Sequence, residues 1–142
     1  MTGNVRGTRL VAWAWPALLS ASCNGATAQR ESSYCGAIFC ADHIIPSQVR
    51  KSSPAEDFNL YRIQWRDRIF VIYEGNSPQE GTQYIRTVES KFGSAELGQG
   101  RGYVEVRIAT RAGGWPQFVV VTVPCAADDC DIEEFVSLLR PR

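Results

Sequence analysis

The chain has 142 residues, with fifteen Lys and Arg balanced by fifteen Asp and Glu, so its formal net charge is zero. That balance excludes the strongly basic surface with which nucleic-acid-binding proteins attract their targets, and we expect no nucleic-acid partner. The hydrophobic fraction of 44% is typical of a chain that folds around a core.

The first 28 residues have the pattern of a secretory signal peptide. Arg6 and Arg9 precede an apolar run from Leu10 to Ala21, and Ala26-Thr27-Ala28 has the small residues of a cleavage site. We expect cleavage before Gln29, which leaves a mature chain of about 114 residues in the periplasm or outside the cell.

Two forms of membrane attachment compete with release of the mature chain. A membrane-spanning helix needs about 20 apolar residues. The run in the leader is shorter and no later segment approaches that length, so we expect no transmembrane span once the leader is removed. A lipid anchor on Cys23 is the minority alternative, because Ser20 stands where lipoprotein leaders carry an aliphatic residue.

The mature chain keeps four cysteines, in two pairs of identical spacing. Cys35 and Cys40 form one pair, and Cys125 and Cys130 form the other. Paired cysteines in an exported protein predict disulfides, and four cysteines allow three connectivities. We favour the two local bridges over bonds that join the two pairs.

The same cysteines argue against a metal or redox centre. A thioredoxin-type site has two residues between its cysteines, whereas each pair here has four. Acidic residues surround Cys130, and His43, the single histidine, would add only one further zinc ligand beside Cys40. We therefore predict no metal and no cofactor.

The mature chain, residues 29–142, has the size of one folded unit of the α+β class. Residues 29–54 form an N-terminal segment that contains the first cysteine pair, and its polar stretch 47–54 reads as a connector. Residues 55–142 hold the regular pattern of the α+β domain.

The first predicted hairpin follows the connector. Tyr61, Ile63 and Trp65 alternate with polar residues, which is the period of a half-buried strand. After a reversal at residues 67–68, the continuous apolar run Ile69–Tyr73 predicts a strand buried on both faces. Turn-forming residues occupy 74–81. Residues 82–92 fit a short helix or a strand, and residues 93–102 indicate a loop.

A second hairpin and a helix complete the prediction. Residues 103–110 alternate as a strand, and the β-branched run 117–123 predicts a central one. Apolar residues recur at helical spacing in 131–140, with Asp131 and Glu134 placed for a capping box. We expect an antiparallel sheet of about four to five strands, made of two hairpins, with the C-terminal helix packed on one face.

Acidic residues cluster just before and within the predicted helix. Such carboxylates can bind calcium or act as acid and base. The spacing of an EF-hand loop is absent, and a helix start favours acids in any case, so helix capping is the preferred interpretation. The cluster comprises Asp128, Asp129, Asp131, Glu133 and Glu134.

Arginines on the predicted strands form a second candidate site. If the hairpins are neighbours, Arg62, Arg66, Arg68 and Arg107 share an exposed face with Tyr103. That face would suit an acidic partner or an anionic ligand. A solvated sheet face is the plainer interpretation, because alternation by itself places polar residues there.

Trp115, in a Gly-Gly-Trp-Pro turn, is the third candidate. A displayed aromatic residue is a typical anchor in a protein partner, although it can equally fold back over the edge of the sheet. The nearby Gly-rich stretch 98–102 lacks the lysine of a phosphate-binding loop and precedes a strand.

These features favour an exported, non-catalytic binding or accessory protein of the bacterial cell envelope, inhibitor-like or immunity-like, whose partner is another exported or envelope protein. No serine–histidine–acid arrangement can be assembled from the sequence. The alternative is a small enzyme or ligand carrier that uses residues 128–134 or the face of Arg62, Arg66 and Arg107. A buried carboxylate in a concave pocket would favour that alternative, and an exposed Trp115 would favour the binding protein.

Overall fold

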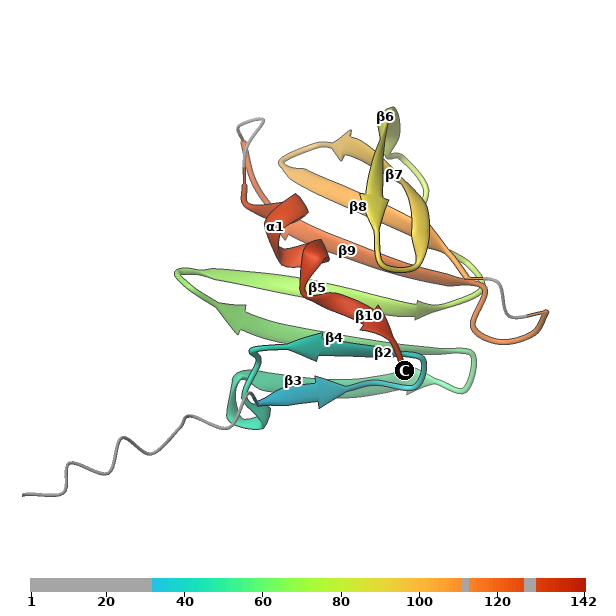
Figure 1. Cartoon of the computed structure of the whole chain (residues 1–142). Coiled ribbons are helices and arrows are strands. Elements are labelled where there is room, and N and C mark those ends of the chain that lie inside the picture. The colour runs from blue at the N-terminus through green and yellow to red at the C-terminus, as the bar shows by residue number, and fades with distance from the viewer. Residues whose placement is uncertain (1–31, 111–112, 127–129) are drawn as a thin grey trace, which may run out of the picture.

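The computed structural model describes residues 32–110, 113–126 and 130–142. The predicted leader, its cleavage site and Cys23 lie outside these residues, as do Asp128 and Asp129. Figure 1 shows a broad antiparallel sheet, with a short helix and a second, smaller sheet on one of its faces.

The large sheet has seven strands in the order β3-β4-β5-β9-β8-β7-β6, and each neighbouring pair is antiparallel. The central position of β9 confirms the prediction from its β-branched sequence. The strands are β3 (Val49–Ala55), β4 (Phe58–Trp65), β5 (Arg68–Gly75), β6 (Gln83–Ser90), β7 (Gly93–Gly100), β8 (Tyr103–Ala109) and β9 (Phe118–Pro124).

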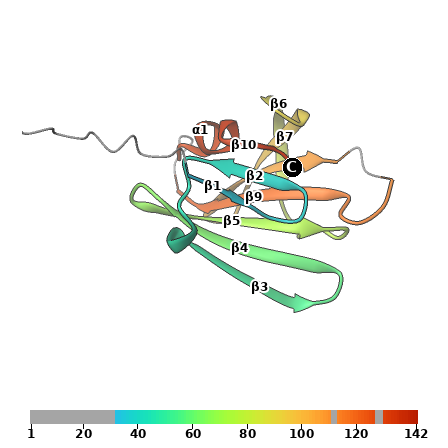
Figure 2. The same ribbon diagram turned by 60° about the horizontal axis from the view of Figure 1, so that its bottom comes forward.

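The small sheet joins the two ends of the described chain. Its strands are β1 (Ser33–Cys35), β2 (Phe39–Asp42) and β10 (Leu139–Pro141), with β2 in the middle. A 3-10 turn, η1 (Pro46–Gln48), leads into β3, and the helix α1 (Ile132–Ser137) precedes β10. Figure 2 shows β1, β2 and β10 lying over the large sheet.

The core lies between the two sheets and under α1. Alternate residues of the central strands face this layer, which explains the period of two seen in the sequence. Phe135 of α1 stacks on Phe70 of β5 with ring centroids 4.0 Å apart, and Trp65 completes the cluster at 5.6 Å from each. Fully buried members from the two sides are Tyr61, Ile63, Phe70, Ile72, Val119, Val121, Phe39, Ile44, Phe135 and Leu139.

The sheet is larger than predicted, because three strands carry a weak signal. Most of the stretch 47–54, predicted as a connector, lies in β3, an edge strand of mostly exposed polar residues that includes Pro54. The ambiguous stretch 82–92 contains β6, and the predicted loop 93–102 contains β7. Gly98 suits β7 because a Cβ there would lie 2.7 Å from the carbonyl oxygen of Gln83 on β6.

Two details of the predicted hairpin and helix are also wrong. The run in β5 is buried on one face only, since Phe70 and Ile72 are buried whereas Ile69 is 49% exposed. The helix ends at Ser137, because the chain then pairs with β2 as β10. Asp131 precedes the helix with a left-handed φ of 56° and makes no side-chain capping bond, so the predicted capping box is absent.

The cysteines pair locally. Cys35 is bonded to Cys40 across the β1–β2 hairpin, and Cys125 is bonded to Cys130 between β9 and α1. These are the two bridges that the sequence argument favours. Each fixes a short connection at one border of the core.

Candidate functional site

A cleft of about 620 Å³ opens between the small sheet and the turn that joins β6 to β7. Figure 1 shows that turn facing the end of β10. The volume falls within the range typical of ligand-binding pockets. Its apolar lining comes from four separate parts of the chain, namely Ile38, Phe92, Ala109 and Pro141.

The polar side chains of the cleft are mostly engaged within the protein. Ser90 donates a hydrogen bond of 2.7 Å to the carbonyl oxygen of Gly93, and Thr110 donates one of 2.7 Å to that of Pro116. Lys91 is the charged residue of the lining, and no carboxylate lines the cleft. The cleft therefore presents apolar surface with one cation beside it.

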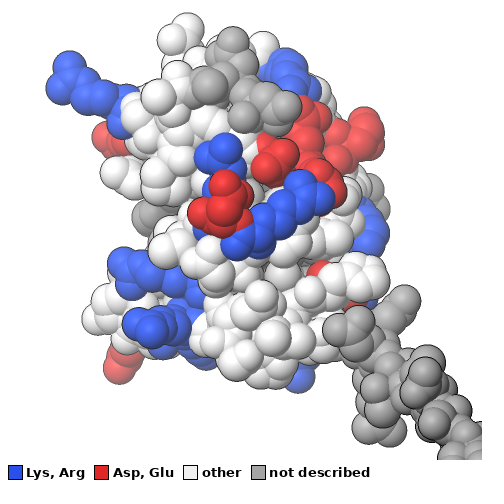
Figure 3. Space-filling model, turned by 90° about the vertical axis from the view of Figure 1, so that its left-hand side faces the viewer, with Lys and Arg blue, Asp and Glu red and all other residues white. Residues whose placement is uncertain are grey.

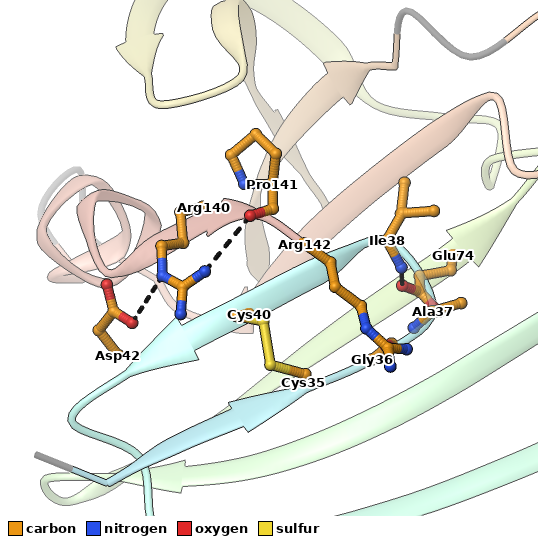
Figure 4. Close-up of a disulfide and its surroundings, with 10 residues drawn as sticks. All are labelled: Cys35, Gly36, Ala37, Ile38, Cys40, Asp42, Glu74, Arg140, Pro141 and Arg142. Carbon is orange, nitrogen blue, oxygen red and sulfur yellow. Dashed lines mark hydrogen bonds and ion pairs between the residues drawn. A yellow bond between two sulfur atoms is a disulfide. The ribbon is translucent and has the colours of Figure 1, made fainter.

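Asp42 connects the three elements that border the cleft. Its carboxylate accepts a 3.0 Å hydrogen bond from Nε of Arg140 on β10 and lies 3.5 Å from Nζ of Lys91 on the β6–β7 turn. Figure 4 shows Arg140 reaching across to Asp42. Because Lys91 and Arg140 are about half exposed, these pairs link the elements around the cleft but add little to the stability of the fold.

Glu74 of β5 is a fully buried carboxylate that lies outside the cleft. It accepts backbone N–H bonds from Ala37 (3.2 Å) and Ile38 (3.0 Å), and hydroxyl and amide bonds from Tyr61 (2.7 Å) and Asn59 (3.4 Å). Figure 4 shows it beneath the turn of the Cys35–Cys40 hairpin. It thereby fastens the small sheet to the large one.

The space around Glu74 is tightly filled, and Glu74 contributes to a raised pKa of the neighbouring Tyr61. A Cβ on Gly36 would lie 2.9 Å from Oε1 of Glu74 and 2.4 Å from the ring of Phe39, so glycine alone fits there. Burial, followed by the hydrogen bond to Glu74, raises the pKa of Tyr61 well above its usual value. Glu74 thus acts as a structural acceptor, with every one of these donors belonging to the fold.

A second buried carboxylate, Glu105, lies on the other face of the large sheet. It is 1% exposed and accepts a 2.6 Å hydrogen bond from Tyr84 of β6, whose pKa is raised by burial and by that bond. Arg107 lies 4.1 Å from the centre of the Tyr84 ring and pairs with Glu96 of β7. These contacts hold the β6–β7 hairpin against β8.

The structure separates the predicted arginine set. The strand register places Arg62, Arg107 and Tyr103 on the outer face, but β5 and β9 lie between Arg62 and the other two. Tyr103 shares a 3.0 Å hydrogen bond with Thr82. Arg66 and Arg68 instead lie at the β4–β5 turn near α1, so no single arginine face forms.

The acidic residues at the start of α1 pair with arginines of the large sheet. Arg66 pairs with Glu134 and lies 3.8 Å from Asp131, and Arg86 of β6 pairs with Glu133. Figure 3 shows basic and acidic side chains interleaved in this region of the surface. The described part of the acidic cluster therefore attaches α1 to the β4–β5 turn and to β6.

Trp115 is partly folded back against the sheet and partly displayed to solvent. Its indole N–H donates to the carbonyl oxygen of Asp57 in the β3–β4 turn, yet the side chain remains 41% exposed. Its loop begins at Thr110, which lines the cleft and binds the carbonyl of Pro116. An exposed aromatic residue and the apolar cleft thus share one connecting loop.

Comparison of the chain with protein families, curated proteins and solved structures finds no match. Within residues 32–110, 113–126 and 130–142, no helix has the length and apolarity to cross a membrane. In those same ranges, His, Cys, Asp and Glu form no group of three that could hold a metal ion.

Proposed function

We propose that the mature chain is an exported binding protein of the bacterial envelope that takes an apolar side chain of a protein partner into the cleft. An inhibitor or an immunity protein acts in this way, by contact and without chemistry. The observation that carries the proposal is the cleft itself, with Ile38, Phe92 and Pro141 lining a cavity of about 620 Å³.

The surroundings of the cleft support a binding role. Its walls are held by a disulfide hairpin and by the contacts of Asp42, and a preorganised site loses less entropy when it binds. The exposed Trp115 on the adjoining loop supplies the kind of residue that anchors protein interfaces. Export is supported by the leader-like N-terminus and by the two disulfides.

A carboxylate-based enzyme receives less support. Glu74 and Glu105 are buried, but neither lines the cleft, and both accept hydrogen bonds from residues of the fold. A ligand carrier is the second candidate. The combination of apolar walls and Lys91 would suit a small molecule with an apolar body and a carboxylate.

Site-specific photo-crosslinking in the producing cells tests the proposal. A photoreactive phenylalanine analogue replaces Phe92, which lines the cleft, and in a matched strain it replaces the exposed Thr87 of β6. We expect a discrete protein adduct at position 92 and none at position 87. Ala109→Phe, which fills the cleft from an exposed position, should abolish the adduct.

The contrary results are distinct. An adduct that forms equally at both positions, or that persists in Ala109→Phe, contradicts a partner in the cleft. If native mass spectrometry of the purified chain shows a retained small molecule that Ala109→Phe displaces, and no protein adduct forms, the chain is a ligand carrier.

A further inference from the structure

The outer face of the large sheet carries two arginines in direct opposition. Arg50 of β3 and Arg62 of β4 are cross-strand partners, so both side chains leave the same face of the sheet. Tyr61 and Ile63, which flank Arg62, point into the core, so this face is the one turned away from the small sheet. Like charges in direct opposition destabilise a strand pair.

No acidic residue relieves this repulsion in the described part of the chain. Arg66, Arg68, Arg86, Arg107 and Arg140 each have a carboxylate within 4 Å, whereas neither Arg50 nor Arg62 does. The two guanidinium groups are thus exposed, adjacent and available to an anion.

The two arginines border a hollow of about 340 Å³. Its other lining residues are Ser47, Gln48, Gln64 and Ile69, so the lining contains hydroxyl and amide groups and no carboxylate. The side-chain oxygen of Gln48 accepts the backbone N–H of Ile45, which leaves the amide nitrogen as a donor. Ile69, 49% exposed, adds an apolar wall.

We propose that this hollow binds a phosphate monoester. The planar donors of two guanidinium groups match the oxygens of a dianionic phosphate, and such charge-assisted hydrogen bonds are the strongest of their kind. Strand pairing fixes the backbone of β3 and β4, and a turn hydrogen bond fixes that of η1, so the positions from which these donors extend are set before a ligand binds. Ile69 accommodates the apolar portion of the ligand that carries the phosphate.

Titration of the full mature chain with inorganic phosphate, followed by ¹H–¹⁵N NMR at constant ionic strength, tests the site. We expect saturable shifts of the Arg50 and Arg62 side-chain N–H signals and no response to chloride. Arg50→Gln and Arg62→Gln should each weaken binding at least about tenfold. Arg101→Gln is the matched control, because Arg101 is an exposed arginine of the β7–β8 turn, outside the hollow.

The source of the phosphate is resolved with vesicles. Arginine-dependent binding to vesicles that contain phosphatidic acid, but not to phosphatidylcholine alone, identifies a lipid headgroup. Binding of free phosphate without vesicle binding identifies a soluble monoester. Absence of saturable shifts, or equal weakening by Arg101→Gln, overturns the site. Because the cleft is lined by other residues, either proposal can fail while the other stands.

Discussion

Tyr61 of β4 donates a 2.7 Å hydrogen bond to Glu74 of β5, and neither side chain has exposed surface. The same carboxylate accepts the backbone N–H groups of Ala37 and Ile38 from the disulfide hairpin. A buried carboxylate is tolerated when donors surround it, and here the donors come from both sheets. Part of the attachment between the two sheets therefore depends on this carboxylate.

Replacing Glu74 should expose that dependence. Glu74→Gln introduces an amide N–H₂ among groups that are themselves donors, so at least one of them loses its acceptor. Hydrogen bonds to charged groups are worth about 1.5–3 kcal/mol each, and we expect a loss of at least that much unfolding free energy. Urea unfolding measures it. Glu89→Gln, at an exposed position of β6, is the control, and a loss equal to that of the control would contradict the structural role.

Stability should fall at alkaline pH for a related reason. Burial and a carboxylate partner raise the pKa of Tyr61 and of Tyr84 in the folded state. An unfolded tyrosine has a pKa of about 10, so the stabilisation is complete below that pH and is lost as the pH rises above it. Phenolate absorbance followed together with circular dichroism should show these two tyrosines ionising only as the protein unfolds. Early ionisation of both in the folded protein would contradict this expectation.

Helix α1 is held by ring packing more than by its ion pairs. Phe135→Ala removes a buried ring that stacks on Phe70 and should cost about 3–5 kcal/mol. Arg86→Ala breaks a pair with Glu133 in which both side chains are about half exposed, and should cost much less than Phe135→Ala because solvent screens such pairs. Chemical denaturation of both variants compares the two terms directly. A larger loss of unfolding free energy for Arg86→Ala would contradict the claim that ring packing holds the helix.

The opposed arginines allow a prediction about stability. Arg50→Gln keeps a long side chain but removes the like-charge contact with Arg62, so the free energy of unfolding should rise by about 0.2–1 kcal/mol. The gain should shrink as salt screens the repulsion in the original chain. Thermal unfolding at low and high salt measures both effects. A destabilised variant would show that Arg50 makes a stabilising contact.

Chain entropy alone would give the two disulfides similar contributions, because each closes a loop with a sequence separation of 5. The chain-entropy relation gives about 2 kcal/mol for so short a loop. Replacing Cys35 and Cys40 with serine should lower the unfolding free energy by more than that value, since the hairpin also supplies the N–H groups that bind Glu74. The Cys125 and Cys130 double variant provides the comparison, and an equal loss for the two would argue against the coupling.

The sequence predicted those elements whose side chains alternate strongly. Tyr61, Ile63 and Trp65 identify β4, and the valines of β9 place it centrally. By contrast, the sequence of β7 indicates a loop because Gly and Ser lower its β-propensity, and pairing with two neighbours stabilises the strand nonetheless. The edge strand β3 lacks an apolar face, so its pattern resembles a connector.

The candidate sites were less accessible to prediction. The cleft is formed by residues 38, 90–93, 109–110 and 141, which only the pairing of β10 with β2 and the β6–β7 turn bring together. Nothing local distinguishes Phe92 or Pro141 in the sequence. Arg62 was singled out from its strand, but its partner is Arg50, in the stretch predicted to lack regular structure. Arg66 departs from the predicted face because it lies in the β4–β5 turn with a left-handed φ of 54° and pairs with Glu134 of α1.

The proposed sites presuppose an exported chain closed by two local disulfides. Intact mass and non-reducing peptide mapping of the protein from its producing cells test this most directly. We predict a mature chain that begins at Gln29, with Cys35 joined to Cys40, Cys125 joined to Cys130, and no free thiol. A chain that retains the leader and carries reduced cysteines would contradict the account, and a lipid on Cys23 would replace release with membrane anchoring.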